Sequence, residues 1–136
     1  MESIYDNEFP INKYDFKYTK VFYENLKSMN YDAPHHFKVR DKDSKEVIAE
    51  INFQEGPIKE VGVNGVMNEE LLSMIITRLE YFQQSKFACS ENALALEYLE
   101  LAMKALKSRT IRREQAGIEG TIIQDPKFEG ENYLWT

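Results

Sequence analysis

Hydrophobic positions follow two different periods along the chain, and the change falls near residue 65. Before this point apolar and polar residues alternate, which is typical of strands with one buried face. After it, apolar residues recur every three to four positions, which is typical of amphipathic helices. The sequence therefore predicts an α+β fold, in which an N-terminal antiparallel β-sheet precedes a C-terminal antiparallel hairpin of two helices.

The strand-like half contains one well-marked β-hairpin. Residues 36–40 (HFKVR) and 46–53 (EVIAEINF) alternate, and the polar residues 41–44 between them have the composition of a turn. Two alternating runs around a polar turn are typical of paired antiparallel strands. This part of the sequence therefore predicts two neighbouring strands of the sheet.

The flanking segments are less regular. Ile58, Val61 and Val63 are expected to add a short strand after the break at residues 56–57. Residues 18–28 permit either a short helix or a strand, because apolar spacing fits the first and β-branched and aromatic content fits the second. Residues 1–17 are expected to form a loosely held tail.

Two helices are predicted in the second half. Asn68 is the expected N-cap of the first helix and Ser90 that of the second, which is expected to run to about Gln115 and to end at Gly117. Apolar residues at helical spacing mark the face that the first helix buries: Leu72, Ile75, Ile76, Leu79 and Phe82. The resulting division is a β-rich region (1–66), a helical hairpin (67–117) and a C-terminal segment (118–136) that docks on a ligand site.

The second helix has more apolar surface than one partner helix can cover. Leu94 and Leu101 lie away from the stripe that contains Leu99, Ala102 and Leu106. The sheet and another subunit are both expected to cover them. We therefore predict a homo-oligomer that assembles through the long helix.

Charge and cysteine content restrict the partners. Acidic residues outnumber basic ones by 23 to 17, and the resulting net charge of −6 argues against DNA, RNA or an anionic membrane as a partner. The single cysteine, Cys89, can form no internal disulfide, so a cytoplasmic location is expected. Any bound anion must therefore be held by a local cluster of cations.

Such a cluster occurs near the end of the second helix. Residues 104–113 (KALKSRTIRR) hold five of the chain's 17 basic residues, and Arg109 and Arg113 share a helix face with Arg112 beside them. Arginine offers a planar fork of donors that matches phosphate oxygens. The alternative is that these cations only oppose the helix dipole. The acidity of the chain favours an anion site, because three crowded arginines repel one another unless an anion binds.

Phe82 and Asn92 are candidate contacts to a base. The Phe82 ring either packs in the core or stacks on a base, and Asn92 either bonds a base edge or a ribose or supports the helix cap. Because the hairpin is antiparallel, Phe82 is expected to lie far from Arg109 within one chain. If both contact one ligand, they come from different subunits.

The segment after the second helix offers two more polar candidates. Thr121 and Asp125 flank the apolar pair at residues 122–123, and Asp125 is able to accept a hydrogen bond from a base amine. The alternative is a strand that docks on the hairpin. Both residues therefore join the predicted ligand site.

Signs of catalysis are few. His35 and His36 are adjacent and point apart in an extended segment, and no Cys or His spacing fits a metal site. No phosphate-binding P-loop or nucleophile motif is present. No cofactor, no metal site and no enzymatic activity are expected.

Residues 51–121 resemble a known phage family. The motifs are GPI-x-E-x-GVNGV at residues 56–66, RL-x-x-FQ at 78–83 and RT-x-x-R at 109–113, the last followed by EGT. Together they resemble the hairpin domain shared by anti-CBASS and Thoeris anti-defence proteins, and the β-rich first half resembles the first Thoeris anti-defence family. One departure is Gln115–Gly117, where many relatives carry a further arginine, and it is expected to weaken phosphate binding slightly.

The resemblance implies a sponge for a nucleotide signal in the cytoplasm of an infected bacterium. Proteins of this family hold glycocyclic ADP-ribose intact, so that the Thoeris effector is not activated, and some relatives also hold CBASS cyclic di- or trinucleotides. They assemble as dimers, often into hexamers, with the ligand between subunits. The carried-over roles are stacking of adenine by Phe82, a grip on the diphosphate by Arg109 and Arg113, and polar contacts from Asn92 and Asp125.

Two other functions remain open on the sequence alone. One is an enzyme that degrades a cyclic nucleotide signal. The other is a module that binds a host defence protein directly. The fate of the bound nucleotide distinguishes the first from a sponge, and nucleotide-free capture of a defence protein marks the second.

Overall fold

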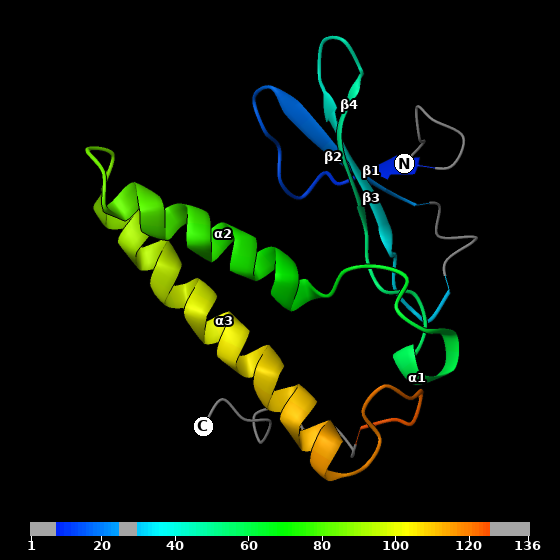
Figure 1. Ribbon diagram of the computed structural model, residues 1–136. Helices are drawn as coiled ribbons and strands as arrows, with labels where there is room; N and C mark the ends of the chain where they lie inside the picture. Colours follow the sequence, from blue (N-terminus) through cyan, green and yellow to red (C-terminus); the bar gives the residue numbers. More distant parts are fainter. Residues whose placement is uncertain (1–7, 25–29, 126–136) are drawn as a thin grey trace. The chain divides into compact units, whose positions relative to one another are not determined.

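The computed structural model describes residues 8–24 and 30–125, which fall into two compact units, residues 1–66 and 67–136 (Figure 1). The first unit contains a four-stranded antiparallel sheet and the second a pair of helices, which confirms the predicted α+β class. Part of the predicted tail (1–7), residues 25–28 of the ambiguous segment and residues 126–136 of the C-terminal segment lie outside the described residues. The predicted homo-oligomer stays a prediction.

The sheet is an antiparallel meander in which each strand pairs with the next along the chain. Its strands are β1 (Glu8–Pro10), β2 (Thr19–Glu24), β3 (His36–Asp41) and β4 (Val47–Asn52). The predicted hairpin is confirmed, because β3 and β4 pair with Phe37 opposite Ile51. Its turn is held by the Asp41 carboxylate, which accepts hydrogen bonds from the backbone N–H groups of Asp43 (2.8 Å) and Ser44 (2.9 Å).

The structure decides one open alternative in the first unit and corrects two expectations. Residues 19–24 take the strand form of the two that the sequence permitted, because β2 pairs on both sides, with β1 and with β3. Residues 8–10 of the expected loose tail form β1, with Phe9 opposite Tyr23. The expected strand around Ile58 is the one-turn helix α1 (Ile58–Val61), which begins after Pro57, a residue suited to helix starts.

Aromatic side chains form a row across one face of the sheet. Ring centroids are 6.1 Å apart for Phe9 and Tyr23, 6.5 Å for Tyr23 and Phe37, and 5.5 Å for Phe37 and Phe53. Such cross-strand aromatic contacts stabilise a sheet by packing. Phe22 points to the opposite face because neighbouring residues alternate, and it is the most buried apolar side chain described, at 4% exposed.

Side-chain amides brace the loop that follows β4. Gln54 donates to the carbonyls of Gly56 (3.0 Å) and Gly62 (2.8 Å), and Asn64 donates to the Glu55 carbonyl (2.7 Å). Gly65 lies so close to Phe53 that an added Cβ would be 2.4 Å from its backbone. The family-like GVNGV motif therefore serves close backbone packing in this loop.

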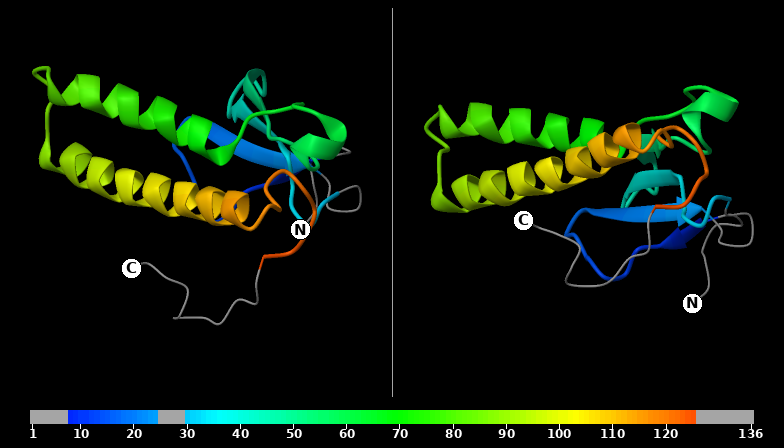
Figure 2. Two further views of the ribbon diagram at one scale, coloured as in Figure 1. Left: turned by 60° about the horizontal axis from the view of Figure 1, so that its bottom comes forward. Right: turned by 90° about the horizontal axis from the view of Figure 1, so that it is seen from below.

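The second unit is an antiparallel helix hairpin, as predicted. Helices α2 (Asn68–Gln83) and α3 (Ser90–Gln115) run side by side in both Figures 1 and 2. The expected N-caps are wrong by one residue, because Asn68 and Ser90 are the first helical residues and Met67 and Cys89 precede them. In place of an Asn68 cap, Glu70 accepts a 2.7 Å hydrogen bond from the Met67 backbone N–H.

Part of the apolar surface of the hairpin stays exposed. Leu72, Ile76 and Leu79 are half-buried, whereas Ile75 of the same predicted stripe is exposed. On α3, Leu94 and Leu101 are also exposed. These two leucines are the residues at which the sequence predicts a subunit interface.

Candidate functional site

Three arginines at the end of α3 converge on one carboxylate. Arg109 Nε donates to Asp125 Oδ2 at 3.1 Å, and Arg112 Nη2 donates to the same oxygen at 3.4 Å. Arg113 Nη1 donates to Oδ1 of the same carboxylate. The structure thus brings together four of the predicted site residues, with an internal anion among the guanidinium groups.

Arg113 differs from the other two arginines in burial. It is 7% exposed, and its guanidinium donates to the carbonyls of Ile118 (3.1 Å), Thr121 (3.1 Å) and Ile123 (3.0 Å) besides Asp125. A buried guanidinium needs partners for its donors, and here the chain itself supplies them. Arg113 therefore holds the C-terminal segment in place.

The other two arginines face solvent. Arg109 has a side chain that is 55% exposed, and that of Arg112 is 37% exposed. Arg109 keeps guanidinium donors that Asp125 does not use, because arginine has five N–H groups. An anion approaching the end of α3 therefore meets Arg109 and Arg112 first.

The end of α3 explains how the segment reaches the arginines. Gly117 has a φ of 74°, a conformation that favours glycine, and its N–H donates to the Glu114 carbonyl at 3.0 Å. The Ile118 N–H donates to the Arg113 carbonyl at 3.0 Å. These two bonds form the Schellman motif, which reverses the chain at a helix C-terminus. Residues 118–125 are thereby returned alongside the last turn of α3.

Thr121 shapes this returning segment. Its hydroxyl donates to the Ile118 carbonyl at 2.5 Å and accepts from the Ile123 N–H at 3.3 Å. Its own carbonyl is one of the acceptors of Arg113. The predicted site residue Thr121 thus lies beside the arginines, and its described bonds form the turn itself.

The charges around Asp125 keep it ionised. Partial burial raises the pKa of its carboxyl, but the Arg113 bond and the charge of Arg109 outweigh this, so the pKa lies below the ordinary value. With Asp125 ionised, the three guanidinium groups and one carboxylate leave a net charge of +2. Glu114 and Glu119 lie in the same stretch of the acidic chain, so this excess of positive charge is local to the guanidinium groups that meet at Asp125.

Phe82 lies at the other end of the hairpin, next to a further arginine. The Arg78 guanidinium is 5.1 Å from the centroid of the Phe82 ring, and Phe87 meets the same ring edge-on at 6.4 Å. Phe82 is half-buried, so neither the core alternative nor the stacking alternative is excluded. The arginine is a neighbour that we did not predict, although its spacing of four residues from Phe82 places it on the same helix face.

The loop at this end is held by Gln83, the last residue of α2. Its side-chain amide donates to the Cys89 carbonyl and accepts from the Cys89 N–H, both at 3.0 Å. This pair of bonds closes the connection between α2 and α3. Phe82 lies just before this connection, at the end of α2, and Asn92 lies just after it, half-buried in the first turn of α3.

The structure does not bring Phe82 and Asn92 to the arginine cluster. Asn92 and Arg109 are 17 positions apart on one continuous helix, a separation of roughly 25 Å at 1.5 Å per residue. Figure 2 shows α3 as one continuous helix, with the connection to α2 at one end and the returning segment at the other. One protomer therefore carries two separated groups of predicted site residues.

Comparison with known proteins identifies the family. The model of the Acb2/Tad1 hairpin domain matches residues 45–110. The chain is also 44% identical, over 128 residues, to "Thoeris anti-defense 1" of Bacillus phage SBSphiJ7, and the match covers 77% of this chain and 90% of that protein. The chain belongs to the Thoeris anti-defense 1 family.

The resemblance noted in the sequence is thereby confirmed. The hairpin match includes Phe82, Asn92 and Arg109, whereas the remaining arginines and the returning segment follow its last residue. In this member of the Thoeris anti-defense 1 family, the C-terminal partner of the arginines thus lies beyond the matched hairpin domain. The contact between Asp125 and the arginines therefore adds to what the domain match shows.

None of the helices in the described part of the chain combines the length and the apolar character that crossing a membrane demands. Within residues 8–24 and 30–125, no group of three or more His, Cys, Asp and Glu is placed to hold a metal ion. The candidate site is the arginine cluster at the end of α3.

Proposed function

We propose that this chain is a phage anti-defence sponge, which binds glycocyclic ADP-ribose and holds it intact so that the Thoeris effector is not activated. The name of the relative supports an anti-defence role. The observation that carries the ligand class is the convergence of Arg109, Arg112 and Arg113 on the Asp125 carboxylate. A surface that already holds an oxyanion among guanidinium groups suits the diphosphate of such a signal.

The arginines take different roles in this proposal. The resemblance implies a grip on the diphosphate by Arg109 and Arg113, but we propose Arg109 and Arg112 for this role, since their side chains are the exposed ones. Arg113 fixes the segment that carries Asp125, because its donors are bonded to that segment. Asp125 Oδ1 accepts from Arg113 alone among the described bonds, so it retains a lone pair for a base amine.

The ring that stacks the adenine comes from a second protomer. Phe82 and Arg109 lie at opposite ends of one hairpin, so one small ligand contacts both only when two chains combine. The exposed Leu94 and Leu101 on α3 support such an assembly. We therefore propose a homo-oligomer, a dimer or a hexamer assembled from dimers, with the ligand between subunits and with Asn92 beside the ring.

Sequestration needs tight binding but no chemistry. A nanomolar dissociation constant corresponds to about 12 kcal/mol. One stacked base contributes ~1–3 kcal/mol and each charge-assisted hydrogen bond ~1.5–3 kcal/mol, so a few such contacts reach that range when the site is pre-organised. The bonds from Arg113 provide pre-organisation, because they fix the returning segment before a ligand arrives.

The test follows the fate of the signal. Glycocyclic ADP-ribose is incubated with excess protein, the protein is removed by filtration, and the filtrate is analysed by mass spectrometry before and after heat denaturation. A sponge removes the signal and returns it unchanged on heating. Recovery of a hydrolysed product would instead identify an enzyme, and capture of the effector without nucleotide would identify a direct inhibitor.

The range of ligands is a separate question for the same assay. Cyclic di- and trinucleotides from CBASS also carry phosphates that guanidinium groups bind. We propose that they are secondary ligands of this chain. Competition against glycocyclic ADP-ribose measures their affinity, and no displacement at a thousandfold excess would limit the helix-end site to the ADP-ribose class.

A further inference from the structure

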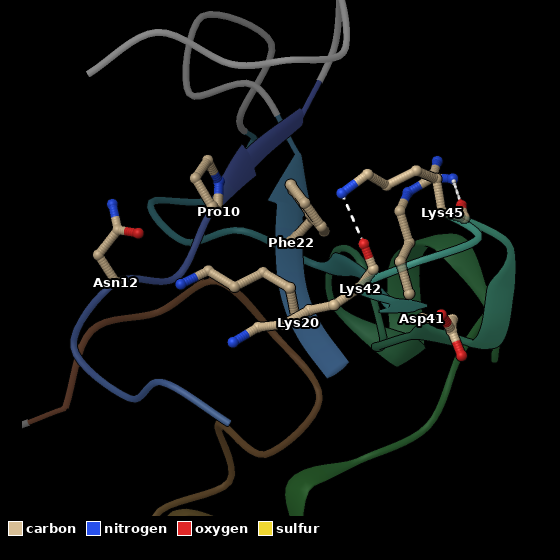
Figure 3. Close-up of a pocket in the computed structure, with 8 residues that line it drawn as sticks. Pro10, Asn12, Lys20, Phe22, Asp41, Lys42 and Lys45 are labelled. Carbon is tan, nitrogen blue, oxygen red and sulfur yellow. Dashed lines mark hydrogen bonds between the residues drawn. The ribbon is translucent and has the colours of Figure 1, made fainter. Parts of the chain in front are cut away.

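The sheet carries a second group of cations that the proposed function does not use. A pocket of about 320 Å³ in the first unit is lined by four cations (Lys20, Arg40, Lys42 and Lys45), by Pro10, Asn12 and Phe22, and by Asp41. The Asp41 carboxylate accepts hydrogen bonds from its own turn. This volume is at the small end of ligand pockets, which start near ~300 Å³. The pocket is shown in Figure 3.

The register of the strands explains why cations gather here. Lys20 on β2 lies opposite Arg40 on β3, and Phe22 lies opposite Lys38. Because side chains alternate along a strand, Lys20, Phe22, Arg40 and Lys42 share one face of the sheet. This is the face opposite the aromatic row.

The walls of the pocket are fixed by bonds to the chain. Arg40 donates to the Lys45 carbonyl at 2.9 Å and to the Glu8 carboxylate at 3.2 Å, and its guanidinium is 5.9 Å from the Phe22 ring centroid. Lys45 Nζ donates to the Lys42 carbonyl at 2.6 Å. The side chains of Arg40 and Lys45 are therefore held in place by these contacts, with their positive charges beside the pocket.

Lys20 and Lys42 are arranged differently. Figure 3 shows both side chains extending in the same direction, toward the side of the pocket that carries Asn12. Their Nζ atoms share the Asp15 carboxylate, at 3.7 Å from Lys20 and 3.1 Å from Lys42. Asp15 has a side chain that is 72% exposed, so it is easily replaced by another anion.

We propose that this pocket binds a small phosphorylated molecule, with its phosphate between Lys20 and Lys42 in place of the Asp15 carboxylate and its organic part against Pro10 and Phe22. Asp15 brings one negative charge to two ammonium groups, whereas a phosphomonoester brings close to two at neutral pH. A phosphate also has more acceptor oxygens for the remaining ammonium protons. The pocket therefore prefers a phosphomonoester to a carboxylate.

The electrostatics of Asp15 agree with an anion site. The hydrogen bond and charge of Lys42, with the charge of Lys20, hold the pKa of the Asp15 carboxyl below its ordinary value. The same two cations therefore already stabilise a negative charge at this point of the chain.

This inference does not depend on the sponge. The pocket is built from strand residues of the first unit, whereas the sponge uses the ends of the hairpin in the second unit. An Arg109→Ala variant is therefore expected to keep the sheet pocket while it loses the helix-end site. The two proposals fail separately.

The experiment is a nuclear magnetic resonance titration of the full ¹⁵N-labelled chain with AMP, inorganic phosphate and adenosine. AMP is expected to shift backbone amides of β2 and β3 and to bind at least tenfold more tightly than adenosine. Binding of inorganic phosphate to the same amides supports the proposal as well, because the phosphate group is the feature recognised. Equal binding of adenosine and AMP, or no shift in β2 and β3 at millimolar AMP, overturns it.

Variants locate the site. Lys20→Gln combined with Lys42→Gln is expected to weaken the affinity for AMP at least tenfold. Lys13→Gln combined with Lys17→Gln removes the same two charges from lysines outside the pocket lining and is expected to leave the affinity unchanged. Asp15→Asn removes the competing carboxylate and is expected to raise the affinity for AMP several-fold. Because Asp15 is exposed, this variant tests the proposal even if the double lysine variant fails to fold. An Asp15→Asn protein with unchanged or weaker affinity overturns it.

Discussion

Arg113 donates to the carboxylate of Asp125, twelve positions further along the chain, from a guanidinium that is almost completely buried. The same guanidinium bonds three backbone carbonyls between them. The course of the returning segment therefore depends on one side chain. The position of Asp125 beside the exposed Arg109 follows from this arrangement.

Asp125→Asn is expected to loosen the returning segment without unfolding the hairpin. The change removes a charged partner from three arginines, and hydrogen bonds to charged groups contribute ~1.5–3 kcal/mol each, less where solvent has access. Hydrogen exchange of the Ile118, Thr121 and Ile123 amides is expected to accelerate. Exchange in the middle of α3 serves as the internal control, and equal acceleration there would show a global effect instead.

Arg109→Ala is expected to weaken the affinity for glycocyclic ADP-ribose by roughly 10- to 100-fold. A lost charge-assisted hydrogen bond costs ~1.5–3 kcal/mol, and about 1.4 kcal/mol corresponds to a tenfold change in affinity. Arg109→Lys keeps the charge but loses the planar fork, so it is expected to recover only part of this loss. Lys107→Ala, a cation two positions earlier, is the matched control. Isothermal titration calorimetry measures the affinities of the wild type and the three variants. An equal loss of affinity in Lys107→Ala and Arg109→Ala would show that the effect comes from overall charge and not from a contact made by Arg109.

Phe82→Ala and Arg109→Ala proteins are each expected to retain less signal than the wild type, and a mixture of the two is expected to retain more than either variant alone. A site between subunits takes its ring from one chain and its arginine from the other, so random assembly of equal amounts restores about a quarter of the sites. The measurement is the amount of signal retained after co-refolding the two variants. A mixture no better than either variant alone would argue for a site within one chain.

The sheet unit is expected to be less stable above neutral pH. The bond from His36 Nδ1 to Asn52 raises the pKa of His36 above its ordinary 6.5, helped by Glu55 at 2.9 Å and by the charge of Glu24, and partial burial opposes this. A raised pKa means that the protonated form is favoured by folding. The added stability is therefore complete below about pH 6.5 and is lost as pH rises through the folded pKa.

This pH effect is checked by urea unfolding at about pH 6 and about pH 8. The free energy of unfolding of the wild-type sheet is expected to fall between the two values, and His36→Gln is expected to remove most of the difference. His35, which is buried and bonded through Nε2 to the Asn30 carbonyl, stays in both proteins. A pH dependence that survives the His36 change would assign it to other groups.

The regular elements could be predicted because their patterns are local. Alternation in residues 36–40 and 46–53 was enough for β3 and β4, and helical spacing with Gly117 was enough for the end of α3. In β2 the local pattern was ambiguous, and pairing with two neighbours decided it. The three residues of β1 carry too little pattern to be recognised without that partner.

The same difference applies to the candidate site. The spacing of Arg109, Arg112 and Arg113 showed that they cluster, but not that Arg113 is buried by the segment after it. That burial depends on carbonyls of an irregular segment, which have no signature in side-chain pattern. The cations around Lys20 were also missed, because Lys20 and Arg40 are far apart in sequence and meet only through strand register.

The length of α3, which keeps Phe82 and Arg109 of one chain apart, affects how the captured signal depends on the concentration of the protein. If the ligand sits between chains, a solitary protomer offers two incomplete halves, and capture requires two molecules to meet. At copy numbers below the dissociation constant of the dimer, doubling expression then raises the captured signal about fourfold rather than twofold. A phage that relies on such a protein gains most from strong, early synthesis, before the host has accumulated its messenger.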